Sequence, residues 1–64
     1  MRGTVTAFDD HVGLGTVIAV DGAEYLFHCV EIADGSRTIA VGTAVEFELL
    51  PKLGRYEASR LSPL

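Results

Sequence analysis

The feature that most constrains the fold of this chain is a two-residue turn signal between two strand-like segments. Residues 14–20 are rich in Val, Ile and Thr, and residues 24–29 contain two aromatic rings in alternation with other side chains. Between them stands Asp21-Gly22, and both residues tolerate the positive φ angles that a tight hairpin needs. Two β-prone runs around such a dipeptide predict a β-hairpin.

Three further segments also have strand character. Residues 3–8 mix β-branched and small side chains. Residues 43–50 alternate, with Val45, Phe47 and Leu49 on one face and glutamates on the other, which is typical of a half-buried strand. Pro51 is expected to end this strand.

A turn at residues 52–54 leads into the last predicted strand, residues 55–61. The alternation places Tyr56, Ala58 and Leu61 toward the core. Residues 33–42 are expected to form a long loop, with one helical turn near residues 30–33. The chain therefore contains five short strands and no amphipathic helix of useful length.

The chain has 64 residues, which is enough for one domain spanning 1–64. Five strands with one long connection between the third and the fourth predict an all-β fold, a five-stranded antiparallel Greek-key barrel. Closure of the barrel protects the edge strands of a short all-β chain. An SH3-like barrel is the structural alternative.

Charge and apolar content limit the partners and the compartment. Nine acidic against five basic side chains give a net charge of −4, which disfavours binding driven by phosphate contacts but leaves base stacking open. No apolar run approaches the roughly 20 residues of a membrane span, so no membrane association is expected. Cys29 is the single cysteine, and a reducing cytoplasm is the expected location.

Several short motifs, taken in order, resemble the bacterial cold-shock domain family, whose fold is the OB-type barrel. Gly3, Val5 and Phe8 match the family's opening Gly-x-Val-Lys-Trp-Phe. Residues 12–17, Val-Gly-Leu-Gly-Thr-Val, keep both glycines of its Lys-Gly-Phe-Gly-Phe-Ile motif. Residues 25–29, Tyr-Leu-Phe-His-Cys, stand where the family has Val-Phe-Val-His-Phe. The similarity continues through the loop at 34–39 and both remaining strands.

The resemblance implies a domain that binds single-stranded RNA or DNA. In this family, successive bases of the strand stack on exposed aromatic rings of the domain. This chain lacks most of those rings. By position, the family's aromatic residues are replaced by Ala7, Leu14, Thr16, Leu26, Cys29 and Ser36. Since each stacking contact contributes about 1–3 kcal/mol, the expected binding is weak.

The candidate binding residues follow from the same alignment. They are Phe8, Leu14, Thr16, Leu26, His28 and Arg37. Lys52 and Arg55 add a sparse basic rim. The alternative function is a protein-interaction or dimerisation module that has lost nucleic-acid binding and uses an apolar face around Leu14 and Leu26, because contiguous apolar patches mark protein contacts.

Strand alternation separates the two faces of the segment that contains residues 24–29. The alignment directs Tyr25 and Phe27 inward, where the family has small valines, and directs Leu26 and His28 outward. A one-residue shift of register would reverse this assignment and return two aromatic rings to the surface. The matching His28 favours the first register.

The sequence offers no catalytic or metal-binding constellation. Adjacent residues of a strand point to opposite faces, so His28 and Cys29 do not form a catalytic pair. Zinc needs about four ligands in recognisable spacings, which are absent. The Gly13-x-Gly15 segment is followed by a predicted strand and not by a helix, so it is not a dinucleotide-binding loop. No enzyme activity and no cofactor are expected.

Overall fold

The computed structural model describes all residues from Met1 to Leu64. It contains five strands and one short 3₁₀ helix. Their bounds are β1 Arg2–Asp9, β2 Leu14–Ala19, β3 Glu24–His28, η1 Cys29–Glu31, β4 Ala44–Lys52 and β5 Arg55–Pro63. All five predicted strands are present, and the all-β prediction is confirmed. No helical segment is long and apolar enough to cross a membrane.

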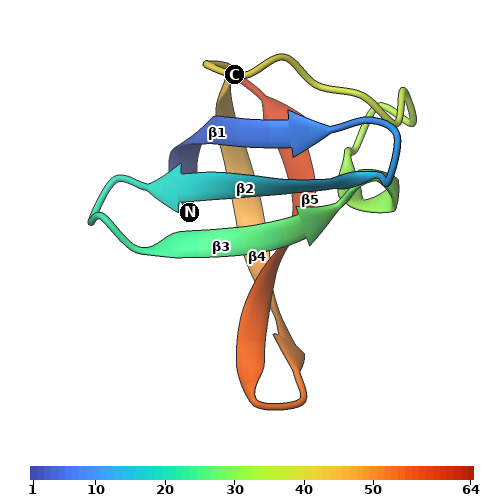
Figure 1. Ribbon diagram of the computed structural model, residues 1–64. Helices are drawn as coiled ribbons and strands as arrows, with labels where there is room; N and C mark the ends of the chain where they lie inside the picture. The colour runs from blue at the N-terminus through green and yellow to red at the C-terminus, as the bar shows by residue number, and fades with distance from the viewer.

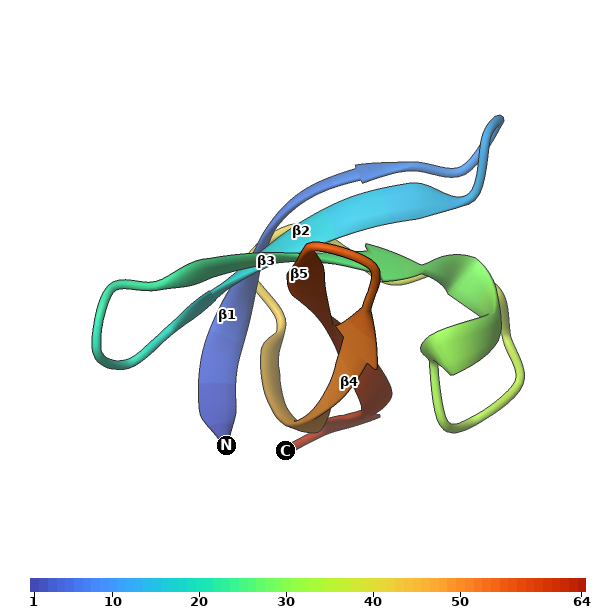
Figure 2. The same ribbon diagram turned by 90° about the horizontal axis from the view of Figure 1, so that it is seen from below.

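The strands form one antiparallel sheet in the order β3-β2-β1-β4-β5. In Figure 1, β1, β2 and β3 run side by side across the molecule, while β4 and β5 pass behind them at a steep angle. The two edge strands, β3 and β5, contact each other, so the sheet curls back on itself. Figure 2 shows this curl from below, with η1 and the first part of the chain that follows it on one side.

The hydrophobic core lies inside the curled sheet. Its members are Val5, Val17, Ala19, Phe27, Ile32, Val45, Phe47, Ala58 and Leu61. Phe27 is fully buried, and Tyr25 packs against the core with its ring 6.0 Å from that of Phe47. The register that directs Tyr25 and Phe27 inward is therefore confirmed.

Gly15 shows why this register needs a glycine in β2. It pairs with Phe8 on one side and with Phe27 on the other. A Cβ atom at this position would lie only 2.5 Å from Cζ of Phe27. Without that atom, the rings of Phe8 and Phe27 stack with their centres 5.8 Å apart and their planes 6° from parallel.

The β4–β5 hairpin is longer than the sequence pattern predicts. Pro51 does not end β4, which continues to Lys52, and Pro51 pairs with Tyr56. The pairing of β4 with β1 involves only Ala44–Glu46, so the far part of β4 has a free edge where proline is tolerated. In Figure 1 this part of the hairpin projects below the barrel.

Tyr56 corrects the predicted core. Its side chain is 58% exposed, whereas Ala58 and Leu61 are buried as expected. Tyr56 lies on the projecting part of the hairpin, where no other strand crosses to cover it. Strand alternation indicates the face on which a side chain lies, but it does not show where along the strand other strands stop covering that face.

Candidate nucleic-acid interface

The solvent side of β1, β2 and β3 brings four of the predicted site residues together. Thr16 pairs with Ala7 on β1 and Leu26 on β3, which gives one cross-strand row. The next row joins Asp9, Leu14 and His28. Side chains of one face lie two residues apart along a strand, so these two rows are neighbours. We call the surface formed by Ala7, Leu14, Thr16, Leu26 and His28 the outer face.

The outer face is apolar and hydroxyl-bearing but has no aromatic ring. Leu14, Thr16 and Leu26 are half-buried, and His28 is exposed. The hydroxyls of Thr6 and Thr16 share a hydrogen bond of 2.9 Å. Small rings and bases can lie against such a surface, but they cannot form the offset stacks that aromatic side chains provide.

Phe8 does not belong to the outer face, which corrects its place among the candidate residues. The pairing of β1 with β2 shifts between Val5 and Ala7, so a β-bulge reverses the alternation after Thr6. Phe8 is therefore directed to the inner side, where it is half-buried and stacks on Phe27. Its ring packs against the core from a half-buried position.

A charged cluster that the sequence does not predict lies at the edge of the outer face. Glu57 of β5 is only 3% exposed, and its two carboxylate oxygens have different partners. His28 Nδ1 lies 3.1 Å from Oε1, while Arg55 Nη2 and Nε lie 3.0 and 3.3 Å from Oε2. We call Glu57, His28 and Arg55 the Glu57 cluster.

The Glu57 cluster keeps a buried carboxylate ionised. Burial by itself raises the pKa of the Glu57 carboxyl, but the hydrogen bonds from Arg55 and the nearby charges of His28, Arg55 and Lys52 lower it more. The resulting pKa lies below the ordinary value of a glutamate. An ionised carboxylate only accepts hydrogen bonds, so Nδ1 of His28 is the donor in the contact with Glu57.

The signal for this cluster is present in the sequence but is not specific. Arg55 and Glu57 are two residues apart in one strand, so their side chains share a face. Nothing in the sequence shows that the barrel brings this face against His28, which is 29 residues away. Three consecutive buried residues, Glu57–Ser59, also break the expected alternation.

Arg37, the remaining candidate, lies in the chain between η1 and β4 and belongs to neither cross-strand row of the outer face. It is exposed, has a φ of 62° and makes no hydrogen bond or ion pair. The turn before it is fixed by Asp34, which accepts a 2.9 Å hydrogen bond from the Ser36 backbone. That backbone hydrogen bond is the main cause that lowers the pKa of Asp34.

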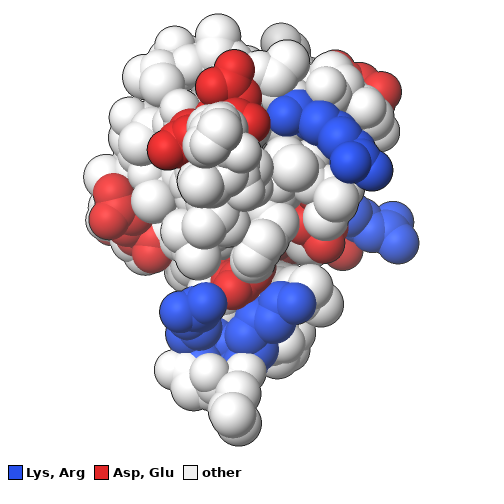
Figure 3. Space-filling model, turned by 45° about the vertical axis from the view of Figure 1, so that its right-hand side comes forward, with Lys and Arg blue, Asp and Glu red and all other residues white.

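The basic side chains nearest to the Glu57 cluster belong to the β4–β5 hairpin. Lys52 and Arg55 are cross-strand partners there, and both are exposed. Figure 3 shows Lys and Arg side chains on this hairpin with acidic atoms between them. Tyr56, next in the chain, is the one aromatic residue that is exposed. Lys52 and Arg55, two of the three cations expected to form a basic rim with Arg37, therefore lie together beside the buried carboxylate of Glu57.

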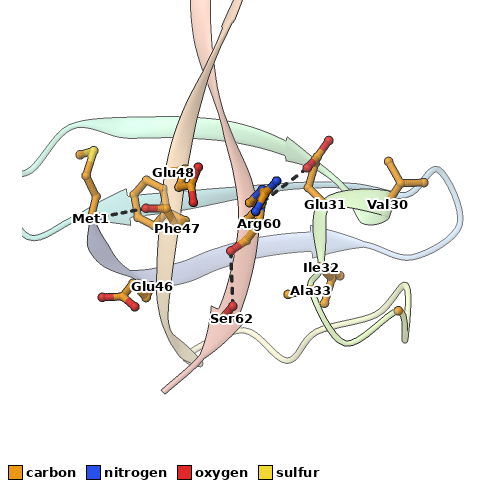
Figure 4. A pocket seen from close by; sticks show the side chains of 11 residues that line it. Met1, Val30, Glu31, Ile32, Ala33, Glu46, Phe47, Glu48, Arg60 and Ser62 are labelled. Carbon is orange, nitrogen blue, oxygen red and sulfur yellow. Dashed lines mark hydrogen bonds between the residues drawn. The ribbon is translucent and has the colours of Figure 1, made fainter.

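The one hollow in the surface contains no residue of the outer face. It is an open hollow of about 690 Å³ between η1, β4 and β5. Figure 4 shows three glutamates around it, Glu31, Glu46 and Glu48, with Arg60 as the basic side chain. Carboxylates repel a phosphate backbone, so this hollow is a poor nucleic-acid site.

No group of three or more His, Cys, Asp or Glu side chains comes close enough to hold a metal ion. Cys29, at the start of η1, is half-buried and free. Its sulfur lies where a side chain at Gly13 would begin, 2.8 Å from such a Cβ atom. Gly13 has a φ of 75°, so glycine there meets both a steric and a conformational need.

The family can now be assigned. The 'Cold-shock' DNA-binding domain matches residues 1–64, the whole chain. This protein belongs to the cold-shock domain family. The resemblance seen in the short motifs is thereby confirmed at the level of the family, and the barrel is of the OB type. Cold-shock domains are nucleic-acid-binding modules and are not enzymes in general.

Solved structures support the same assignment. The Drosophila protein "Unr CSD456" superposes with a TM-score of 0.82 at 31% sequence identity. The match covers 98% of the present chain but only 26% of the Unr chain, so it concerns one part of a longer protein. Among curated proteins, none matches this sequence.

Proposed function

We propose that this cold-shock domain binds single-stranded RNA or DNA through its outer face and that it binds weakly. The observation that carries the proposal is the common location of Leu14, Thr16, Leu26 and His28 on one surface of a chain that belongs to a nucleic-acid-binding family. The Glu57 cluster borders this surface and adds the exposed cations of the β4–β5 hairpin.

The low affinity follows from the composition of the face. A base that stacks on an aromatic ring gains about 1–3 kcal/mol, and the outer face offers leucine, threonine and alanine at the corresponding positions. Neighbouring contacts are coupled, so their losses do not simply add. Even a total loss of about 4 kcal/mol of binding free energy raises the dissociation constant roughly a thousandfold.

A contact with another protein, or dimerisation, through Leu14 and Leu26 is the competing outcome. Both side chains are half-buried, so they expose only part of their apolar surface. Large contiguous apolar patches are what mark protein contacts. The nucleic-acid proposal therefore has the stronger support. With one free cysteine, we also keep the cytoplasm as the proposed location.

The proposal is tested by NMR titration of ¹⁵N-labelled protein with a pyrimidine-rich single-stranded oligonucleotide at low and moderate salt. We expect shifts centred on Leu14, Thr16, Leu26 and His28 that diminish as salt rises. A double strand of the same sequence should shift these signals less. Unchanged spectra at high micromolar oligonucleotide would overturn the proposal, and analytical ultracentrifugation would then test for a dimer.

A matched pair of variants locates the interface. Thr16→Glu places a carboxylate in the centre of the outer face, where it should repel the strand and reduce binding at least tenfold. Ser62→Glu makes a comparable change beside the acidic hollow and should have little effect. Equal losses in both variants would mean that net charge, and not the outer face, governs binding.

A further inference from the structure

In the Glu57 cluster, the side chains of His28 and Arg55 are held by hydrogen bonds to Glu57, and each keeps nitrogen atoms that do not contact Glu57. His28 meets Glu57 only through Nδ1, and its side chain is 47% exposed. Arg55 uses Nε and Nη2, and its side chain is 61% exposed. A guanidinium has five N–H donors and a protonated imidazole has two, so both groups keep donors for a ligand.

We propose that Glu57 is a positioning residue, whose buried carboxylate holds His28 and Arg55 side by side so that together they bind a backbone phosphate of a single strand. The inference rests on the proposed function and adds to it a phosphate subsite and the residue that orients it. Each cation is attached to a different oxygen of one carboxylate, so the two groups are close neighbours. Because the side chains of His28 and Arg55 are already ordered, binding costs less conformational entropy.

Charge determines when the subsite can accept a phosphate. With a neutral imidazole, Arg55 and Glu57 cancel, and Nε2 of His28 can only accept a hydrogen bond. With a protonated imidazole the cluster has a net charge of +1, and Nε2 becomes a donor. Protonation of the imidazole should therefore increase the affinity of the cluster for a phosphate.

The other charged groups around His28 do not reverse this sign. From β5 it faces Glu57 and Arg55. Lys52 of β4 pairs with Arg55 and adds a positive charge on the side of the hairpin. Asp9 of β1 lies in the same cross-strand row but beyond Leu14, on the other side of β2.

The proposal has a rival with the opposite sign. If Glu57 only neutralised the two cations, Glu57→Gln would add one unit of positive charge and strengthen binding. If Glu57 positions them, the same variant should weaken binding about tenfold, despite the more favourable charge, because the phosphate loses oriented charge-assisted hydrogen bonds. The dissociation constant of one variant therefore separates the two ideas.

The experiment measures fluorescence anisotropy of a labelled oligothymidylate with the full chain from pH 8 to pH 6. Glu48→Gln, which makes the same charge change beside the acidic hollow, is the matched control. We expect weaker binding in Glu57→Gln alone, with a flatter pH profile than in the unaltered protein. Equal or tighter binding in Glu57→Gln would overturn this inference alone. No binding by the unaltered protein would overturn the proposed function and this inference together.

Exposed residues provide a second route in case Glu57→Gln does not fold. His28→Gln and Arg55→Gln, singly and combined, form a double-mutant cycle on side chains that are 47% and 61% exposed. A shared phosphate predicts that the combined loss is smaller than the product of the single losses. Fully independent losses would contradict a shared subsite. Titration with inorganic phosphate shows whether the cluster binds a free anion or requires the strand.

Discussion

The inner and outer faces of β1, β2 and β3 have opposite chemistry, although they alternate residue by residue along the same strands. The inner face contains Phe8, Tyr25 and Phe27, with two of the rings stacked over Gly15. The outer face has leucine, threonine and alanine at the corresponding positions. Aromatic side chains thus pack into the core of this domain and are absent from its outer face. A strand can change one face while it keeps the other, because the two faces share no side chains.

The largest expected effect tests this contrast between two adjacent residues of β3. Phe27→Ala removes a fully buried ring and should cost about 3–5 kcal/mol, which is comparable with the whole stability of so small a domain. Leu26→Ala removes a half-buried side chain of the outer face and should cost roughly 1 kcal/mol.

Urea denaturation followed by circular dichroism measures both changes. We expect Phe27→Ala to be largely unfolded in buffer, and Leu26→Ala to unfold cooperatively at a slightly lower midpoint. Similar losses of stability in the two variants would contradict the separation of the faces.

The second expected effect is a gain of function on the outer face. Leu14→Phe and Leu26→Phe return rings to positions where the family stacks bases, and each ring should contribute up to about 1–3 kcal/mol. The double variant should bind a single-stranded oligonucleotide at least tenfold more tightly than the unaltered protein.

The control for this gain is Val20→Phe, which adds a ring at the exposed turn between β2 and β3. Anisotropy titrations of the three proteins at one salt concentration give the comparison. If Val20→Phe binds as tightly as the double variant, general hydrophobicity and not the outer face would be responsible.

These two faces also show how far the sequence predicts the structure. The β-hairpin around Asp21-Gly22 and the alternation of residues 43–50 follow from local rules, and the structure confirms both, with Gly22 alone of the two turn residues at a positive φ. The inward direction of Phe27 follows from the family alignment, and the structure confirms it as well. The places where prediction failed involve contacts between distant segments. A bulge after Val5 turns Phe8 inward, and the barrel ends before Tyr56, and neither event has a local signal.

The Glu57 cluster is the part of the candidate site that sequence reasoning could not find. Strand alternation describes one strand at a time, whereas this cluster joins the end of β3 to β5 through closure of the barrel. A glutamate between Tyr56 and Ala58 resembles any solvated residue of a strand. Its burial becomes evident only when His28 and Arg55 are placed against it.

The smallest expected effect concerns pH, because a buried, ion-paired carboxylate joins β3 to β5 at the edge of the outer face. The pKa of Glu57 is lower in the folded protein than the value of 4.5 that an ordinary glutamate has. Folding is therefore stabilised by this group at pH values above about 4.5, and that contribution is lost as the pH falls through the lower, folded-state pKa. Thermal unfolding between pH 7 and pH 3 should show a melting temperature that declines in the acid range. Glu57→Gln cannot ionise at this position, so its melting temperature should be lower at pH 7 and should decline less steeply below pH 4.5. Parallel pH profiles of the two proteins would mean that other carboxylates govern the acid response, and that the edge of the outer face is held by packing after all.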